Sequence, residues 1–208
     1  MAGEFGIGQS VPRYEDPRLL RGRGRYIADM TFPNMLHGYV LRSPHAHAVI
    51  RSIDTRAAKQ VPGVHAVYIG EDWAQCGFGD LPNGGSRKKR DGSPMYVPPY
   101  PALCQDRVRR VGDYVAFVVA DSVNQAMDAA ELIEVDYEPL PASTSTAKAS
   151  DPDTPPVWDE NPDNVCYTHF EGDEAATKAA FDKADHVVRQ TFNINRVSAN
   201  SMETRGCI

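Results

Sequence analysis

The chain has 208 residues, of which 41 % are apolar and 24 % are charged, as in an ordinary globular protein. Its net charge of −6 disfavours binding to the phosphate backbone of nucleic acids. No apolar run approaches the roughly 20 residues that a membrane-spanning helix needs, and residues 1–10 lack the pattern of a secretory signal. The composition therefore predicts a cytoplasmic protein without a membrane span and without a nucleic-acid partner.

Four cysteines are spread along the chain: Cys76, Cys104, Cys166 and Cys207. None of them forms a Cys-x-x-Cys pair, so the spacing indicates neither a zinc clip nor an iron–sulfur loop. Because no secretory signal is visible, we expect free thiols in a reducing compartment rather than two disulfides.

Residues 1–34 are rich in glycine, proline and charge, which predicts an extended entry with one short strand at residues 25–28. The sequence Gly22-Arg-Gly24 invites comparison with a phosphate-binding loop. It lacks the third glycine of the dinucleotide fingerprint, no strong strand precedes it and no helix clearly follows. A tight structural turn is therefore the favoured interpretation.

From residue 36 onward a regular pattern begins. The β-rich runs cover residues 36–42, 48–53 and 64–69, with the turn signal Ser43-Pro44 after the first. Between the second and third runs, Asp54 or Thr55 can cap a short helix that ends at Gln60. This part of the chain is therefore predicted to form a β–β–α–β unit.

Residues 70–106 break this regularity with many glycines and prolines, which predicts a long surface excursion that is functional or faces a partner. The excursion contains the basic run Arg-Lys-Lys-Arg at residues 87–90. Nucleic-acid binding would need interleaved aromatic residues or a wider basic face. A solvated loop is the favoured interpretation, with docking of a partner second and nucleic acid third.

Residues 107–140 predict a strand–helix–strand unit. Residues 115–120 form an unbroken apolar run, as in a strand buried on both faces, and Ser122 with Gln125 has the spacing of a helix capping box. The predicted buried face of the helix consists of Val123, Ala126, Met127, Ala130 and Ile133. In the strand that follows, Ile133, Val135 and Tyr137 alternate with the acidic residues Glu134, Asp136 and Glu138.

Residues 141–165 are expected to be a linker, because Ser, Thr, Ala, Asp and five prolines dominate them. Beyond it, Asp173 can cap a helix that runs to about Ala184, with Ala176, Ala180 and Phe181 on one side. A strand is predicted at residues 186–194, and residues 196–208 are irregular or begin another strand. The predicted domains are residues 1–140, a linker at 141–165 and an incomplete α/β segment at 166–208, in an α+β protein.

Several side chains are candidates for chemistry, and each also has a structural interpretation. His45 and His47 are two residues apart and supply half a metal site at most, because no third ligand has a suitable spacing. Cys104 and Cys207 lack an activating neighbour in the sequence. Glu203 has no evident acid–base partner, so a salt bridge or cap is favoured over a general base.

The motifs of this chain resemble those of one known family. These are residues 108–121 (VRRVGDYVAFVVAD), 128–141 (DAAELIEVDYEPLP), 8–26 (GQSVPRYEDPRLLRGRGRY), 42–48 (RSPHAHA) and 62–64 (PGV). In this order they resemble the α/β hammerhead domain in the large subunit of molybdenum hydroxylases, the family of xanthine dehydrogenase, aldehyde oxidase and carbon monoxide dehydrogenase. Residues 172–206 are similar to the opening of the family's molybdopterin-binding region, although Thr204 stands where many relatives have proline.

The resemblance implies part of an oxidoreductase that hydroxylates aldehydes, N-heterocycles or carbon monoxide with water as the oxygen source. It implies molybdenum on molybdopterin cytosine dinucleotide in the complete enzyme. It also implies partner subunits that carry 2Fe-2S clusters and FAD, as in bacteria, and none of these cofactors on this chain alone. The family's glycine-rich cofactor segment and general base have no counterpart in residues 1–208, so no catalytic or metal-binding residue is assigned and cofactor-binding residues stay open.

Two functions follow from this resemblance. The first is an N-terminal scaffold within a molybdenum hydroxylase large subunit, inactive by itself. The second is a non-catalytic assembly module, a subunit that is naturally split. The reading frame after Ile208 distinguishes them, because only the first requires it to continue through the cofactor segment. In both cases Glu134, Asp136 and Glu138 become a solvated or partner-facing edge instead of a catalytic carboxylate pair.

Overall fold

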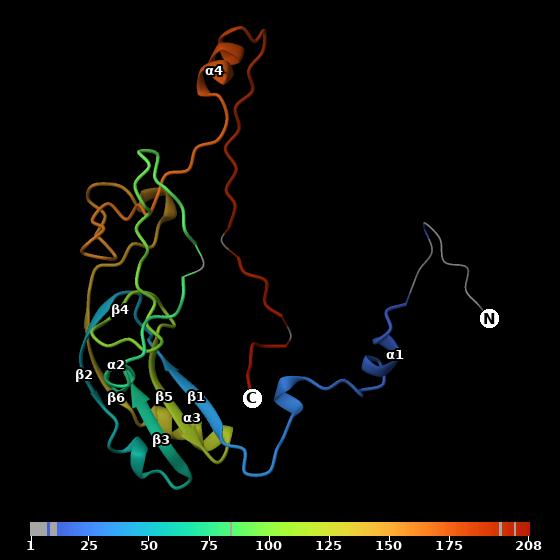
Figure 1. Cartoon of the computed structure of the whole chain (residues 1–208), viewed down its shortest axis with the longest axis vertical. Coiled ribbons are helices and arrows are strands. Elements are labelled where there is room, and N and C mark those ends of the chain that lie inside the picture. Colours follow the sequence, from blue (N-terminus) through green and yellow to red (C-terminus); the bar gives the residue numbers. More distant parts are fainter. Residues whose placement is uncertain (1–7, 9–11, 84, 196, 202) are drawn as a thin grey trace. The chain divides into compact units, whose positions relative to one another are not determined.

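The computed structural model describes residues 8, 12–83, 85–195, 197–201 and 203–208. The chain divides into two compact units, one of residues 36–185 and one that combines residues 1–35 with 186–208. Within the described residues, the larger unit holds two three-stranded antiparallel sheets with helices between their strands (Figure 1). This confirms the predicted α+β class. No helix in the described ranges is long and apolar enough to cross a bilayer.

The first sheet has the strand order β1-β5-β3 (Figure 1). Its strands are β1 (His37–Arg42), β5 (Tyr114–Ala120) and β3 (Val64–Ile69), close to the runs predicted from β-branched residues. In the central strand, Val118 is fully buried and pairs with Tyr39 on one side and Val67 on the other. The unbroken apolar run of β5 is thus explained by its position between two neighbours.

The second sheet has the order β4-β2-β6 and is smaller. Its strands are β4 (Arg107–Val108), β2 (Ala48–Asp54) and β6 (Glu134–Pro139). The pairing of Ile50 with Tyr137 fixes the register of β2 against β6, with a shift before Ser52. The predicted alternation of β6 is confirmed, because its three acidic side chains are exposed while Val135 and Tyr137 are partly buried.

The helix α3 (Val123–Glu131) connects β5 of the first sheet to β6 of the second, so the strand–helix–strand unit crosses between the sheets. Its predicted cap is confirmed, since the Ser122 hydroxyl accepts the backbone N–H of Gln125 at 3.3 Å. The predicted buried face is partly wrong, because Val123 and Met127 are exposed and Ala129 is buried instead. The helix is rotated so that its smallest residues meet the sheet.

The main core lies between α3 and the first sheet, and alanine dominates it. Small side chains bring the helix backbone close to the strands, and valines fill the remaining volume. A second cluster lies between the two sheets and includes Cys104, Val108 and Val115. The fully or largely buried residues of the main cluster are Ala58, Val67, Ala116, Val118, Ala120, Ala126, Ala129, Ala130 and Ile133.

Three local predictions need correction. The strand expected at residues 25–28 is instead the 3₁₀ turn η1 (Ile27–Asp29), because Asp29 accepts the Tyr26 N–H and bends the chain. The helix expected up to Gln60 is shortened to the 3₁₀ turn η2 (Ala58–Gln60), since the Asp54 carboxylate accepts the Arg56 backbone N–H.

The excursion at residues 70–106 begins with a helix that was not predicted because of the glycine content of this stretch, α2 (Gly70–Gln75). Gly70 is required there, because an added Cβ would lie 2.4 Å from the Cys104 carbonyl oxygen.

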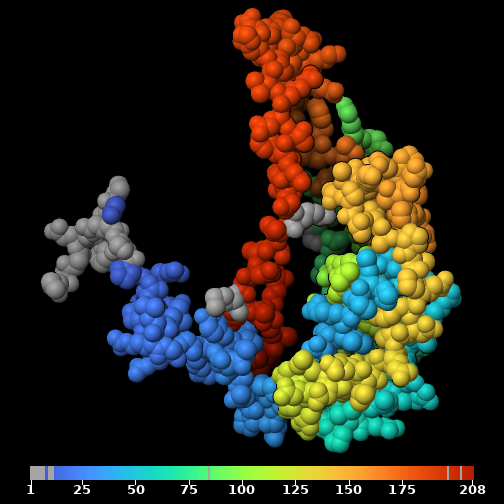
Figure 2. Space-filling view, turned by 180° about the vertical axis from the view of Figure 1, so that it is seen from behind, coloured from blue at the N-terminus to red at the C-terminus, as the bar shows by residue number. Residues whose placement is uncertain are grey.

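Residues 141–165 contain the short turn η3 (Thr146–Lys148) and otherwise irregular chain. Figure 2 shows these yellow-to-orange residues as a compact mass. The helix α4 (Glu174–Asp182) follows, with the predicted cap confirmed by a 2.8 Å bond from the Ala176 N–H to Asp173. Residues 186–194 do not form the predicted strand, because no strand among the described residues lies beside them to pair with.

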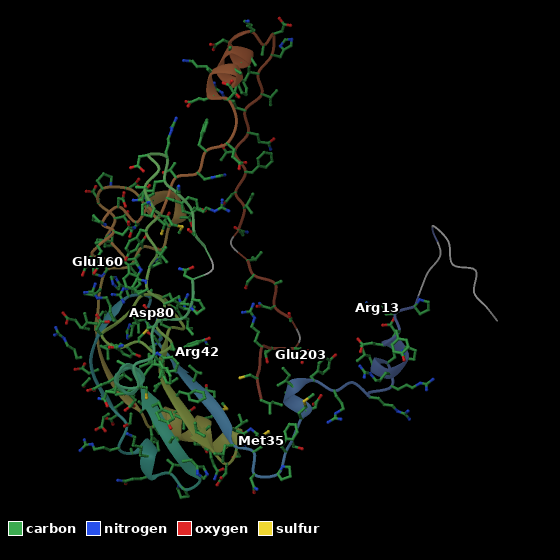
Figure 3. All side chains as sticks on the ribbon, in the orientation of Figure 1. Arg13, Met35, Arg42, Asp80, Glu160 and Glu203 are labelled. Carbon is green, nitrogen blue, oxygen red and sulfur yellow. The ribbon has the colours of Figure 1, made fainter. Side chains whose placement is uncertain are left out.

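The smaller unit contains α1 (Asp16–Leu19), η1 and the described parts of the tail. The backbone N–H of Ile27 donates to the Glu203 carboxylate at 3.2 Å, and Gly206 lies against the Ile27 side chain. Figure 3 labels Glu203 beside the η1 turn. Residues 197–201 and 203–208 are irregular, which confirms one of the two alternatives predicted for residues 196–208. Arg196 and Met202 lie outside the described residues.

Candidate functional site

The glycines at the entry form a turn. Gly22 has a positive φ of 66° and its N–H donates to the Leu19 carbonyl at 3.0 Å, which ends α1. Gly22-Arg-Gly24 therefore follows a helix instead of opening one, and the structural interpretation is confirmed. Glu203 caps the η1 turn through the Ile27 N–H, in agreement with its expected structural role.

The two histidines have separate partners. The His45 ring packs on Tyr137 with a centroid distance of 4.8 Å. His47 is only 8 % exposed, and its Nδ1 lies 2.9 Å from the Pro141 carbonyl oxygen. A carbonyl only accepts, so Nδ1 carries the proton, while Nε2 is buried without a hydrogen-bond partner among the described residues. Within the same residues no group of three or more His, Cys, Asp or Glu is placed to hold a metal ion.

The basic run at residues 87–90 is a loop that its own chain partly holds. The Arg87 guanidinium lies 5.8 Å from the ring centroid of Tyr167, and that of Arg90 lies 5.1 Å from Phe170. Arg90 also forms a 3.5 Å ion pair with Glu174. The arginines at both ends therefore anchor the loop, and Lys88 between them is exposed.

The cysteines and the acidic edge offer no paired chemistry. All four cysteines are free, as predicted. Burial raises the pKa of the Cys104 thiol to about 12, which keeps it protonated and unreactive. Glu138 forms an ion pair with Arg51, and Glu134 and Asp136 are exposed. These observations fit a solvated edge.

The most developed polar site lies in the turn between β4 and β5, which the sequence analysis did not single out. The Asp113 carboxylate accepts the backbone N–H of Arg109 at 2.7 Å and that of Arg110 at 3.1 Å. It also accepts the Arg110 Nε–H at 2.7 Å. Asp113 is nearly buried, so the turn is fixed by a carboxylate whose oxygens are already in use.

Residues 141–165 pack against this turn, and we call them the strap. The Arg109 guanidinium stacks on the Trp158 ring at 3.6 Å and donates its Nε–H to the Val157 carbonyl at 3.3 Å. Arg107 forms a 3.3 Å ion pair with Asp159. Figure 3 labels Glu160 in this part of the chain. The apolar pattern of the sequence does not predict that the strap packs on this turn. The contact depends on Arg109 and Trp158, which are 49 residues apart in the sequence.

Asn164 organises the strap internally. It has a positive φ of 58°, which asparagine tolerates better than most residues. Its side-chain oxygen accepts the Val157 N–H at 2.8 Å, and its amide nitrogen donates to the carbonyls of Ala149 at 2.9 Å and Pro155 at 3.1 Å. One side chain therefore fastens three separate points of an irregular segment.

Two cavities lie beside the arginine turn. The larger has a volume of about 470 Å³ and the smaller about 180 Å³, and Arg109, Arg110 and Val157 line both. The larger cavity is completed by Asp113, Asn83, Trp158, Tyr100, Pro82, Pro98, Pro99 and Pro101. The smaller is completed by Ala46, His47, Val111, Ala142 and Ser143. The site thus combines rigid apolar walls with two guanidinium groups.

The molybdopterin cofactor implied by the resemblance does not fit the residues present. From Gly172 onward the described chain consists of α4 and exposed irregular segments. A cofactor of this size is held in a concave site that covers most of its surface, and an exposed chain contacts it from one side only. The described residues therefore do not form a molybdopterin cradle by themselves.

The chain matches known proteins over nearly its whole length. Residues 21–141 match the family model described as aldehyde oxidase and xanthine dehydrogenase, a/b hammerhead domain, and residues 157–208 match the molybdopterin cofactor-binding domain. The carbon monoxide dehydrogenase large chain of Afipia carboxidovorans is 36 % identical over 98 % of this chain and 25 % of the relative. The nicotine 6-hydroxylase large subunit of Paenarthrobacter nicotinovorans is 39 % identical over 97 % of this chain and 24 % of the relative.

Solved structures agree with these relatives. A crystal structure of Cu,Mo-CO dehydrogenase superposes with a TM-score of 0.70 at 36 % identity, covering 87 % of this chain and 23 % of that one. Quinoline 2-oxidoreductase from Pseudomonas putida 86 gives a TM-score of 0.58 at 46 % identity, covering 70 % of this chain and 18 % of that one. The chain thus spans about a quarter of the length of the curated relatives it matches. It belongs to the aldehyde oxidase and xanthine dehydrogenase family, the molybdenum hydroxylases, and carries the hammerhead domain of their large subunits.

Proposed function

We propose that this chain is the N-terminal scaffold part of the large subunit of a bacterial, cytoplasmic molybdenum-dependent hydroxylase and is inactive alone. The observation that carries the proposal is the order of the two matches, the hammerhead domain first and the start of the cofactor-binding domain second. The substrate class is an aldehyde, an N-heterocycle or carbon monoxide, in keeping with the description of the matching family model and the names of the relatives. The complete protein would use molybdopterin cytosine dinucleotide, with 2Fe-2S and FAD on partner subunits.

The domain arrangement proposed for this role is a hammerhead domain at residues 1–140, a linking strap at 141–165 and the beginning of the cofactor-binding domain at 166–208. The larger unit supports a scaffold role, because it holds two clusters of buried side chains and two three-stranded sheets. The exposed apolar side chains of the tail support the proposal that further polypeptide covers them in the complete protein. Val188, Phe192 and Ile194 are 90 %, 73 % and 86 % exposed, so their apolar alternation has no partner within the described residues.

A chimera tests the scaffold role. This chain replaces the matched quarter of the nicotine 6-hydroxylase large subunit, and the chimera is expressed with that enzyme's own remaining subunits. We expect the purified complex to contain molybdenum and to hydroxylate nicotine. The substitution Val118→Asp, which buries a charge in the central strand, is expected to abolish both, whereas Asp182→Asn on exposed α4 is expected to abolish neither. A chimera that assembles without molybdenum would contradict the proposal.

The exposed apolar tail also favours a second candidate, a non-catalytic assembly module that pairs its tail with a separate chain. The two functions differ in the gene. A reading frame that continues past Ile208 through the cofactor-binding domain supports the scaffold within one chain. A stop codon there, followed by a separate gene for the remainder, supports the split subunit.

A further inference from the structure

Arg109 is a partly buried cation without a carboxylate partner in the described part of the chain. Its guanidinium donates to two backbone carbonyls, Val157 at 3.3 Å and Arg107 at 3.4 Å, and its face lies on Trp158. None of the ion pairs formed by described residues includes it. Burial lowers the pKa of Arg109, although the acidic Asp106 and Glu160 oppose this from a distance. Buried charges in proteins are ordinarily paired, so this group has unused capacity for an anion.

The carboxylate of the same turn, Asp113, cannot supply that partner. Asp113 Oδ2 accepts the N–H groups of Arg109 and Arg110, and Oδ1 accepts the Arg110 Nε–H. Its oxygens are therefore directed into the turn and toward Arg110. The Arg110 guanidinium also lies over the Tyr100 ring at 4.9 Å. The turn thus carries two guanidinium groups against one carboxylate.

Both guanidinium groups border the larger cavity of about 470 Å³. Its other walls include four prolines and two aromatic rings, side chains that lose little conformational entropy when a ligand binds. A volume in this range is typical of sites for small organic ligands or for inserted side chains. Planar carboxylates match the fork of an arginine, and aromatic and proline surfaces accept an apolar body.

We propose that the larger cavity is a binding site for a carboxylate group, held by Arg109 beside Arg110, with the organic part of the ligand against Tyr100 and Trp158. A monoanion is favoured over a phosphate dianion, because Arg109 is the one cavity-lining guanidinium without an ion pair to a described carboxylate, and the Asp113 carboxylate also lines the cavity. The carboxylate belongs either to a small molecule or to a glutamate or aspartate of a polypeptide. The site does not depend on the proposed function, since all its residues lie in the hammerhead unit and the strap.

The 208-residue chain contains two tryptophans, so Trp73→Phe leaves Trp158 as the only fluorescent indole, directly under Arg109. This variant is titrated with benzoate and, separately, with benzamide, which has the same shape without the charge. We expect benzoate to change the Trp158 fluorescence to saturation and to bind at least about ten-fold more tightly than benzamide, because only the carboxylate pairs with the guanidinium. Equal affinity of the two compounds would overturn the proposal.

Two blocked peptides identify the source of the carboxylate. N-acetyl-Tyr-Glu-amide carries a side-chain carboxylate, and N-acetyl-Tyr-Gln-amide is its neutral control. Tighter binding of the glutamate peptide than of benzoate assigns the site to a polypeptide, and the reverse order assigns it to a small molecule. If neither benzoate nor the glutamate peptide binds, or if inorganic phosphate binds as tightly as they do, the carboxylate site is refuted.

Variants locate the binding. In the Trp73→Phe background, Arg109→Gln is expected to abolish benzoate binding, whereas Lys88→Gln removes the same charge from an exposed loop position and is expected to leave it unchanged. If Arg109→Gln fails to fold, the unsubstituted chain still answers the question. Benzoate is then expected to shift the Nε–H resonance of Arg109 in an NMR titration and not that of Arg51, which already pairs with Glu138.

Discussion

Cys104 shows how burial suppresses the chemistry of a single residue. Its thiol is 6 % exposed between the two sheets, and burial, followed by the nearby Asp113 charge, raises its pKa to about 12. At pH 8 we expect a thiol reagent to modify the exposed Cys76 and Cys207 in the folded chain and to reach Cys104 only after unfolding. Rapid modification of Cys104 in the folded protein would contradict its placement.

The same pKa shift predicts a dependence of stability on pH. The thiol in an unfolded chain has a pKa of roughly 8.5, below the folded value, so the folded state holds its proton to a higher pH. The contribution of the protonated Cys104 thiol to the free energy of unfolding is therefore fully present below about pH 8.5 and is lost as the pH rises toward 12. Cys104→Ala removes this contribution. Urea unfolding between pH 7 and 10 should show a shallower decline for the variant than for the unsubstituted chain, and parallel curves would contradict the assignment.

At the scale of elements, the strap depends on one amide. Asn164 accepts the Val157 N–H and donates to two carbonyls, so Asn164→Ala leaves three backbone groups to find new partners. We expect a loss of about 1–3 kcal/mol in the free energy of unfolding of the larger unit, measured with urea. The matched control is Asn193→Ala in the exposed tail, for which a change below about 0.5 kcal/mol is expected. Equal effects of the two substitutions would show that the strap is not fastened by Asn164.

For the tail we expect the opposite result, because the described side chains of Phe192 and Ile194 are largely exposed. Phe192→Ser combined with Ile194→Ser should lower the binding of a hydrophobic dye to the 208-residue chain and leave its melting temperature unchanged. Asn193→Ser between them is the control that should change neither. A melting temperature lowered by several degrees would show that the tail packs in the isolated chain.

The elements also show which features a sequence can reveal. The strands β1, β2, β3, β5 and β6, the Ser122 cap of α3 and the Asp173 cap of α4 follow from local periodicity and short hydrogen bonds, so the sequence predicts them with nearly correct bounds. The two-residue strand β4 is too short to leave such a pattern. The rotation of α3, which buries Ala129 instead of Met127, depends on the close approach of the sheet and is not encoded in a helical period. The strap and the arginine site depend on the contact of Arg109 with Trp158, for which no local pattern exists. Residues 186–194 have the apolar alternation of a strand, but no strand among the described residues pairs with them.

At the scale of the whole molecule, the extent of packing differs sharply along the described chain. The hammerhead unit has two sheets, two core clusters and a fastened strap, whereas the residues matching the cofactor-binding domain hold one short exposed helix beyond the strap. Burial of apolar area drives folding, and the described apolar side chains of the tail, among them Val188, Phe192 and Ile194, are largely exposed. This contrast explains why a strong family match accompanies a chain with no assembled cofactor cradle in its described residues.

Metal analysis of the 208-residue chain tests the central claim most directly. The chain is purified from a bacterial host that makes molybdopterin, and its molybdenum content is measured by mass spectrometry alongside the chimera with the nicotine 6-hydroxylase subunit. The account predicts only trace molybdenum on the chain alone and stoichiometric molybdenum in the chimeric complex, because the residues of the cradle come from the rest of the large subunit. Stoichiometric molybdenum bound to the 208-residue chain by itself would contradict it.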